Sequence, residues 1–198
     1  MGITVLNHMS LDGVMQAPGR PDEDTRGGFT HGGWAQAFQD EVMGRFLGER
    51  MGRGSGALLF GRRTYEDLLS HWNAQPDSPF APVLNNTPKY VASRTLTEPL
   101  PWPNSTLLSG DAVDAVAAMR QQNPETSLGI MGSRILIHAL MRRDLIDEWL
   151  LLIYPIVLGS GARLFDGGLP PTRLTLSDSL ITTTGVVIAT YRTVGRPD

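Results

Sequence analysis

The chain has 198 residues, of which 41% are hydrophobic and 19% are charged, and this composition is ordinary for a soluble globular protein with one sizeable core. The formal net charge of −3 gives no reason to expect a nucleic acid or an anionic membrane as a partner. The chain contains no cysteine, which excludes disulfides, zinc sites with thiolate ligands and cysteine nucleophiles. The absence of cysteine also fits the cytoplasmic location that we predict.

The sequence contains neither a signal-peptide pattern nor an apolar run long enough for a membrane span. The first residues run directly into a strand-like segment, so we expect no signal peptide. The longest apolar runs, at residues 150–154 and 156–158, are too short to span a bilayer. We therefore expect no membrane partner.

The first part of the chain alternates strand and helix patterns. Residues 3–9 predict a strand, and residues 16–33 predict a long irregular loop because they are dense in Gly, Pro, Asp and Glu. A helical pattern covers 34–51, a second strand covers 57–60, and the next helix places Tyr65, Leu68, Leu69 and Trp72 on one face. Residues 73–87 are rich in Pro and Asn and predict a loop.

The second part continues the alternation and then changes to strands. We predict a strand at 89–92, a short one at 107–108, a helix capped by Asp111, a strand at 128–131 and a helix that ends near Arg143. An apolar strand at 150–157 and a glycine-rich loop at 159–168 precede two strands, 174–180 and 186–191, which we expect to pair antiparallel. This order predicts an α/β fold with a mainly parallel central sheet, antiparallel C-terminal edge strands and helices on both faces. We predict one domain over residues 1–198.

The segment Gly61-Arg62-Arg63-Thr64 is the most informative motif, because it joins a predicted strand to a predicted helix. A helix N-terminus attracts anions through its free N–H groups and its dipole, and arginine adds paired donors suited to phosphate oxygens. The segment thus predicts a phosphate site. The alternative is a solvated helix start whose arginines face water.

Other polar residues follow the remaining predicted parallel strands. They are Asp12, the pair Ser93-Arg94 and the pair Gly132-Ser133. Ligands of open α/β sheets bind outside the carboxyl ends of the strands, so these residues and the Gly61 segment should lie at one edge. Together they suit a diphosphate and one separate phosphate, which is what an NADPH-shaped ligand presents.

These motifs resemble those of the dihydrofolate-reductase-like superfamily, specifically the reductase domain of bacterial riboflavin-biosynthesis enzymes (the RibD C-terminal domain) and its stand-alone relatives. The resemblance spans nearly the whole chain, in residues 9–13 (MSLDG), 61–66 (GRRTYE), 91–96 (VASRTL), 131–133 (MGS), 145–148 (LIDE), 155–161 (PIVLGSG) and 164–165 (LF). It implies the three-layer fold of that superfamily and NADPH as the hydride donor.

The resemblance also implies roles for single residues. Gly61, Arg62, Arg63 and Thr64 would hold the phosphate side of the cofactor, and Ser93 and Arg94 would flank its 2′-phosphate. The diphosphate would be cradled by Gly132, Ser133, Arg134 and Ile135, although Met131 stands where dihydrofolate reductases usually have a first glycine. His8 and the residues up to Asp12 would line the nicotinamide end.

The catalytic carboxylate of dihydrofolate reductases has no clear counterpart here. Asp12, Asp24 and Asp40 are the candidates, and we take Asp12 as the catalytic residue, with an ordered water as the alternative source of the proton. Trp34 borders the long loop and is predicted to wall the substrate ring. The zinc-deaminase pattern of the bifunctional riboflavin enzymes is absent, and the four histidines show no metal spacing, so we predict no metal.

The sequence thus predicts an NADPH-dependent reductase of a small heterocyclic substrate, similar to 5-amino-6-(5-phosphoribosylamino)uracil reductase of riboflavin biosynthesis. Three alternatives stay open: a dihydrofolate reductase, a reductase that uses a flavin or deazaflavin, and a non-catalytic nucleotide-binding protein with the same fold. Relatives of this kind commonly pair, and the apolar strands near the C-terminus suit a shared sheet, so we expect a homodimer.

Overall fold

The computed structural model describes residues 2–52, 56–75, 78 and 80–195. The chain divides into two compact units. Unit 1 comprises Met1–Val5 and Arg53–Asp147, and unit 2 comprises Leu6–Gly52 and Glu148–Asp198. The first strand, β1 (Ile3–Ser10), begins in unit 1 and ends in unit 2.

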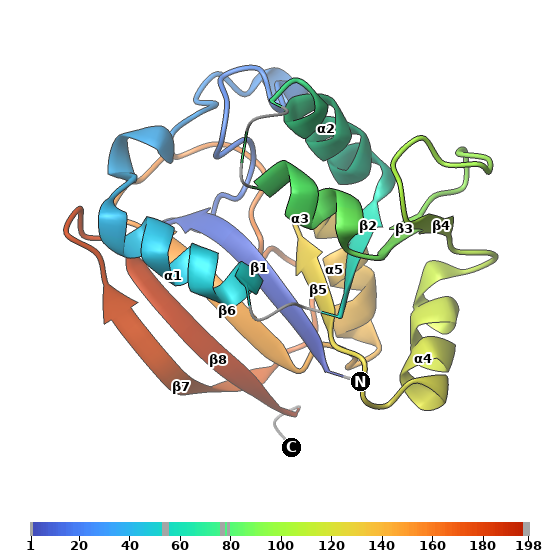
Figure 1. The fold of residues 1–198 in the computed structure, drawn as a ribbon. Coiled ribbons are helices and arrows are strands. Elements are labelled where there is room, and N and C mark those ends of the chain that lie inside the picture. Colours follow the sequence, from blue (N-terminus) through green and yellow to red (C-terminus); the bar gives the residue numbers. More distant parts are fainter. Residues whose placement is uncertain (1, 53–55, 76–77, 79, 196–198) are drawn as a thin grey trace. The chain divides into compact units, whose positions relative to one another are not determined.

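Unit 1 carries the parallel part of the sheet (Figure 1). Its strands follow the order β4 (Ser105–Leu107), β3 (Lys89–Ala92), β2 (Ala57–Gly61), β5 (Leu128–Met131) and then β1. β2 pairs in parallel with both β3 and β5, and β3 pairs in parallel with β4. Parallel strands need long crossovers, and helices provide them here: α2 (Arg62–Asn73), α3 (Phe80–Asn86), α4 (Ala112–Gln122) and α5 (Arg134–Arg142).

The helices of unit 1 cover both faces of its strands. Residues 57–60 of β2 are all buried, as expected for a parallel strand between two helical layers. On one face, a cluster joins β2 and β3 to α2 and α3 through Leu58, Phe60, Tyr65, Leu84, Val91 and Trp102. Figure 1 shows α3 in front of this part of the sheet and α5 behind it.

Unit 2 carries the antiparallel edge. Its strands follow the order β1, β6 (Glu148–Tyr154), β8 (Val187–Gly195) and β7 (Arg173–Ile181), and β8 is antiparallel to both β6 and β7. The helix α1 (Glu41–Gly52) packs on one face of these strands, and two short 3₁₀ helices, η1 (Arg26–Gly28) and η2 (Gln36–Phe38), interrupt the preceding loop. The core joins Met43 of α1 to Leu150, Leu152 and Tyr154 of β6 and to Ile188 of β8.

The predicted α/β class, with a mostly parallel sheet and an antiparallel edge, is confirmed. The prediction of a helix over 34–51 was wrong in its first turns. The Asp40 carboxylate accepts the backbone N–H of Met43 at 2.8 Å, so it caps a helix that begins only at Glu41.

The prediction of a loop over 73–87 was also wrong, because α3 lies within it. Pro82 occupies the first turn of this helix, where a missing N–H costs little. Ala81 and Leu84 are buried, and Trp72 packs against Phe80 with ring centroids 5.5 Å apart. Burial of these side chains therefore outweighs the loop-like composition.

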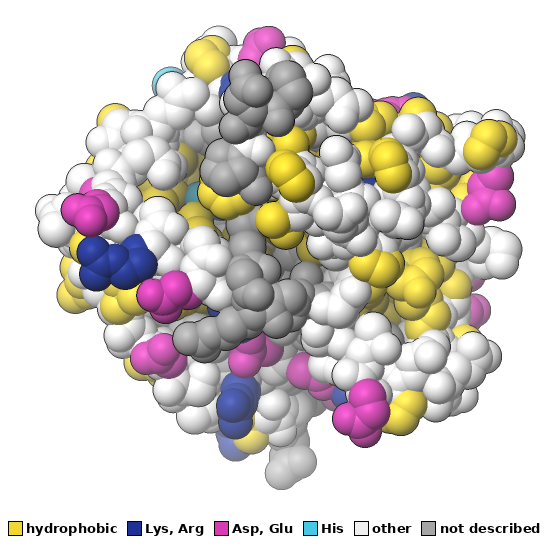
Figure 2. All heavy atoms as spheres, viewed as in Figure 1, with side chains coloured by type: hydrophobic (Ala, Val, Ile, Leu, Met, Phe, Trp, Pro, Cys, Tyr) yellow, Lys and Arg dark blue, Asp and Glu magenta, His cyan; other side chains and the backbone are white. Residues whose placement is uncertain are grey.

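Within residues 2–52, 56–75 and 80–195, no helix is long and apolar enough to cross a membrane. On the face shown in Figure 2, the described basic side chains are scattered among acidic and uncharged ones.

Candidate functional site

The carboxyl ends of β3, β2 and β5 lie next to one another in unit 1, because these three strands are neighbours and parallel. The Gly61 N–H donates to Ser133 Oγ at 2.9 Å, and the Ser133 N–H donates to Thr64 Oγ1 at 3.0 Å. These two hydrogen bonds tie the β2–α2 turn to the β5–α5 turn. The structure thus brings together the two segments that the sequence assigned to cofactor phosphates.

Both helices that leave these turns begin without a side-chain cap. Gly61 precedes α2 and Ser133 precedes α5, and neither N-cap makes a side-chain hydrogen bond to its own helix. The first N–H groups of a helix need partners from outside it, and a bound anion supplies them. Two such N-termini side by side suit a diphosphate.

The β5–α5 turn has an unusual backbone. Gly132 and Ser133 both have positive φ, at 57° and 56°. A Cβ on Gly132 would lie 3.0 Å from Thr64 Oγ1, so a side chain there would push the two turns apart. The left-handed conformation of Ser133 costs on the order of 1–3 kcal/mol, and such strain is concentrated at functional sites.

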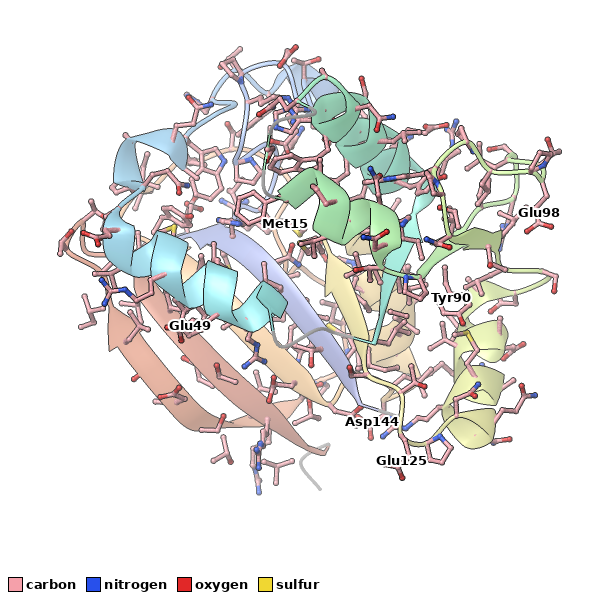
Figure 3. All side chains as sticks on the ribbon, in the orientation of Figure 1. Met15, Glu49, Tyr90, Glu98, Glu125 and Asp144 are labelled. Carbon is pink, nitrogen blue, oxygen red and sulfur yellow. The ribbon has the colours of Figure 1, made fainter. Side chains whose placement is uncertain are left out.

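The basic side chains of the predicted phosphate site lie at the surface of unit 1. Arg62, Arg63 and Arg94 are exposed, and Arg62 makes only a loose pair with Glu66 at 3.6 Å. Ser93 Oγ accepts the N–H groups of Thr95 and Leu96 at 3.1 and 3.0 Å and thereby orders the turn that carries Arg94. The turn is steadied further by Glu98 (labelled in Figure 3), which accepts the Leu107 N–H at 3.0 Å.

Two more predicted residues lie at the start of α5. Arg134 is half-buried, whereas the Ile135 side chain is 70% exposed. An isoleucine so exposed beside polar turns offers an apolar contact surface to a ligand.

Unit 2 places His8 against a buried tyrosine. Its Nδ1 lies 2.6 Å from the hydroxyl oxygen of Tyr154, which is fully buried on β6. Burial lowers the pKa of His8 to about 4 and raises the pKa of Tyr154. Both side chains are therefore neutral at neutral pH.

Asp12 is engaged on all sides by its own unit. Its carboxylate accepts the Ser10 hydroxyl at 2.7 Å and the N–H groups of Leu158 and Gly159 at 3.1 and 2.9 Å, and Arg163 Nη2 lies 3.2 Å away. Hydrogen bonds, first of all that of Ser10, hold its pKa at about 2. An ionised carboxylate of this kind fixes loops well but donates no proton at neutral pH, and the catalytic role of Asp12 stays a prediction.

The other candidate carboxylates have structural partners too. Asp24 pairs with Arg26, and Asp40 caps α1 while its second oxygen accepts the Thr183 hydroxyl at 2.7 Å. A hydrogen bond from Arg26 lowers the pKa of Asp24, and one from the Met43 N–H lowers the pKa of Asp40.

Trp34 lies in the core of unit 2. It is 7% exposed, its Nε1–H donates to the Gln16 carbonyl at 2.8 Å, and its ring stands edge-on to Tyr154 at 5.1 Å. This placement favours packing on Tyr154, and the predicted contact with a substrate ring has no support from it.

Comparison with known protein families gives a match over most of the chain. The sequence pattern of the RibD C-terminal domain matches residues 2–188. The chain belongs to this family. The match covers most of both units and all of the candidate site residues discussed above.

Several known proteins are similar to this chain in sequence or in fold. "Uncharacterized protein YyaP" of Bacillus subtilis (strain 168) is 28% identical over 139 residues, which are 68% of this chain and 72% of the relative. The crystal structure of a putative riboflavin biosynthesis protein from Shewanella sp. PV-4 superposes with a TM-score of 0.73 at 24% identity over 98% of this chain and 99% of that one. Acinetobacter baumannii RibD gives a TM-score of 0.64 at 14% identity, over 98% of this chain and 58% of that longer chain.

Tyr154 is the site residue that sequence reasoning missed. It ends the apolar run Leu150-Leu151-Leu152-Ile153-Tyr154, and its hydroxyl is the one polar side-chain group in that run. A buried tyrosine hydroxyl usually has a hydrogen-bond partner, so the run did carry a signal. The identity of the partner was not visible, because His8 lies 146 residues earlier.

Proposed function

We propose that the protein is an NADPH-dependent reductase of a small heterocyclic substrate. Membership of the RibD C-terminal domain family supports a reductase-like role. The observation that carries the choice of cofactor is the pair of uncapped helix N-termini in unit 1, joined through Ser133 and flanked by exposed arginines.

The residues of unit 1 fit the phosphates of such a cofactor. The glycine at 132 leaves space that a Cβ would fill, and the N–H groups at the starts of α2 and α5 are aimed at a common edge. In this proposal Arg94, on the turn that Ser93 orders at the end of β3, would meet the 2′-phosphate. When bound, NADPH supplies a hydride, and the chain's own contribution is to hold and orient the reactants.

We propose a substrate similar to 5-amino-6-(5-phosphoribosylamino)uracil, whose ribose is reduced to ribitol. The support is the resemblance to the riboflavin-biosynthesis reductases, together with the fold shared with the Shewanella protein. No feature of the described residues favours dihydrofolate over this substrate class, since none of the three candidate carboxylates is free of structural partners.

The cofactor is tested by fluorescence titration with NADPH and NADH. We expect NADPH to bind more tightly, and Arg94→Ala to weaken NADPH binding by about tenfold or more while NADH binding is unchanged, because a charged hydrogen bond contributes about 1.5–3 kcal/mol. Arg45→Ala, which changes an exposed arginine of α1, is the matched control. Equal affinity for both nucleotides in wild type would refute the 2′-phosphate site, and binding of neither, with retention of a flavin, would favour the flavin-type alternative.

We also propose that the protein is a homodimer. The edge strand β7 leaves Leu176 and Ile181 exposed, at 52% and 70%, and its outer backbone edge has no partner strand among the described residues. Long exposed edge strands with apolar residues tend to pair with another chain.

A further inference from the structure

His8 and Tyr154 form a hydrogen-bonded pair in unit 2. Packing accounts for the position of Tyr154 but not for that of His8. Tyr154 is buried, and its ring meets Trp34 and Phe38 edge-on, with centroids 5.1 and 5.7 Å away. Its position is therefore fixed. The His8 ring is only half-buried, near the carboxyl end of β1.

The Tyr154 hydroxyl has two neighbours that can accept its single proton. His8 Nδ1 is 2.6 Å away and Met43 Sδ is 3.6 Å away. A thioether is a weak acceptor, whereas an unprotonated imidazole nitrogen is a good one. The hydroxyl proton consequently goes to Nδ1, and the neutral imidazole carries its own proton on Nε2.

The second ring nitrogen of His8, Nε2, takes no part in the hydrogen bond to Tyr154. Among the described residues, no hydrogen bond reaches it, and Tyr154 is the titratable side chain that contacts the ring. The nearest carboxylate in the sequence, Asp12, is bound by Ser10 and Arg163. A neutral N–H donor held at one angle and free of protein partners is what the stabilisation of a developing anion requires.

We propose that His8 is a catalytic residue whose Nε2–H donates a hydrogen bond to the heteroatom of a carbonyl or imine acceptor, and that Tyr154 is the positioning residue that fixes this tautomer. The proposal rests on the reductase function. The acceptor carbon gains a hydride, the π electron pair of the C=O or C=N bond moves onto the heteroatom, and a proton from water completes the O–H or N–H group. His8 keeps its own proton throughout, because a neutral imidazole does not give up a second proton in water.

Two substitutions at His8 separate catalysis from packing. The amide of Asn reaches about as far as Nδ1, and the amide of Gln about as far as Nε2. His8→Asn can therefore keep the Tyr154 contact, while His8→Gln can keep a donor at the outer position. With NADPH and 5-amino-6-(5-phosphoribosylamino)uracil, we expect His8→Asn to lower kcat by about 10²–10³-fold, the usual effect of removing one such donor, and His8→Gln to lose much less.

The order of kcat among the variants distinguishes a catalytic role of His8 from a purely structural one. KM for NADPH should stay unchanged in both variants, and His71→Gln, at the end of α2, should behave as wild type. A purely structural His8 would give the opposite order, with Asn tolerated better than Gln. Full kcat in His8→Asn would overturn the proposal while leaving the reductase function intact, whereas an inactive wild type that binds no nicotinamide cofactor would overturn both.

A second readout needs no turnover. In protein labelled with ¹⁵N-histidine, the His8 signals, assigned by their loss in His8→Asn, should show the neutral Nε2–H tautomer at pH 7 and still at pH 5.5. Tyr154→Phe should remove this preference and return a mixture of tautomers. An Nδ1–H tautomer, or an imidazolium at pH 7, in wild type would overturn the proposal.

Discussion

Asp12 joins two loops of unit 2 through a single carboxylate. It accepts the Ser10 hydroxyl from its own turn and two N–H groups from residues 158 and 159, and Arg163 pairs with it and donates to its backbone carbonyl at 2.9 Å. The hydrogen bond from Ser10, with those from the N–H groups of Leu158 and Gly159, favours the ionised form and lowers the pKa to about 2 against the usual 3.8. The residue therefore acts as an anchor for the segment that follows β1.

Asp12→Asn should lower the free energy of unfolding by about 1–3 kcal/mol, because the amide leaves donors of both loops poorly satisfied. The loss depends on pH. The folded-state pKa lies below the unfolded value, so the contribution of Asp12 is fully present above about pH 4 and is lost as the pH falls from 3.8 through 2. Urea unfolding of wild type and variant at pH 7 and near pH 2.5 measures this.

Asp22→Asn is the matched control, since the Asp22 side chain is 89% exposed. It should differ little from wild type at either pH. A stability difference between wild type and Asp12→Asn that is as large near pH 2.5 as at pH 7 would contradict the assignment.

Lys89, at the start of β3, determines how the short helix α3 ends. Its Nζ donates to the carbonyls of Leu84 and Thr87 at 2.6 and 2.7 Å and lies 5.1 Å from the centre of the Trp102 ring. The side chain is 1% exposed. The amine thereby satisfies carbonyl groups that the end of a helix leaves without intrahelical partners.

Lys89→Met should destabilise unit 1 by about 1–3 kcal/mol, because one buried and one partly buried carbonyl lose their donor. Burial lowers the pKa of Lys89 to about 8, against 10.5 ordinarily. Between these values the unfolded chain binds more protons, so wild-type stability should rise with pH over this window relative to the variant. Chemical denaturation at pH 7.5, 9 and 10 tests both statements, and a gap that narrows with rising pH would contradict them.

Gly159 and Gly161, in the glycine-rich loop after β6, both have positive φ but have different surroundings. Gly161 has φ 111°, and a Cβ there would lie 2.7 Å from both Phe29 and Val14. Gly159 has φ 75° and open space around it. Gly161→Ala should therefore cost about 1–3 kcal/mol more than Gly159→Ala, since overpacking adds to the backbone penalty that the two share. Equal midpoints in thermal unfolding of the two variants would refute this.

Strands were more predictable than helix boundaries, for a physical reason. Residues 57–60 are all buried, and residues 128–131 alternate between buried and half-buried, so composition alone located β2 and β5. The start of α1 depends on one hydrogen bond of Asp40, and α3 depends on packing by Ala81 and Leu84. Residue composition predicts neither contact.

In the candidate site, too, some features were predictable from the sequence and others were not. The proximity of the candidate phosphate residues of unit 1 was predictable because each follows the end of a parallel strand, and topology brings such ends together. The partners of His8 and Asp12 were not, because Tyr154, Leu158 and Arg163 come from the far end of the sequence.

At the scale of the whole molecule, the edge strand β7 allows the dimer to be tested directly. Light scattering should give twice the chain mass of 21.6 kDa. A double substitution, Leu176→Lys with Ile181→Lys, should give the single mass, because charges on an edge strand oppose pairing. A wild-type monomer would refute the dimer, and a variant that remains dimeric would place its interface elsewhere.

The residues of the two units are completed at different points along the chain, so the units become able to fold at different times during synthesis. Unit 1 has all of its residues once Asp147 has been made, whereas unit 2 needs β6, β7 and β8 to cover the face of α1. At roughly 5–20 residues per second, the apolar side of α1 waits several seconds on the ribosome for its partners. The nascent chain is thus most open to chaperones, and most liable to aggregate, after unit 1 has been made and before the last quarter of the chain has followed.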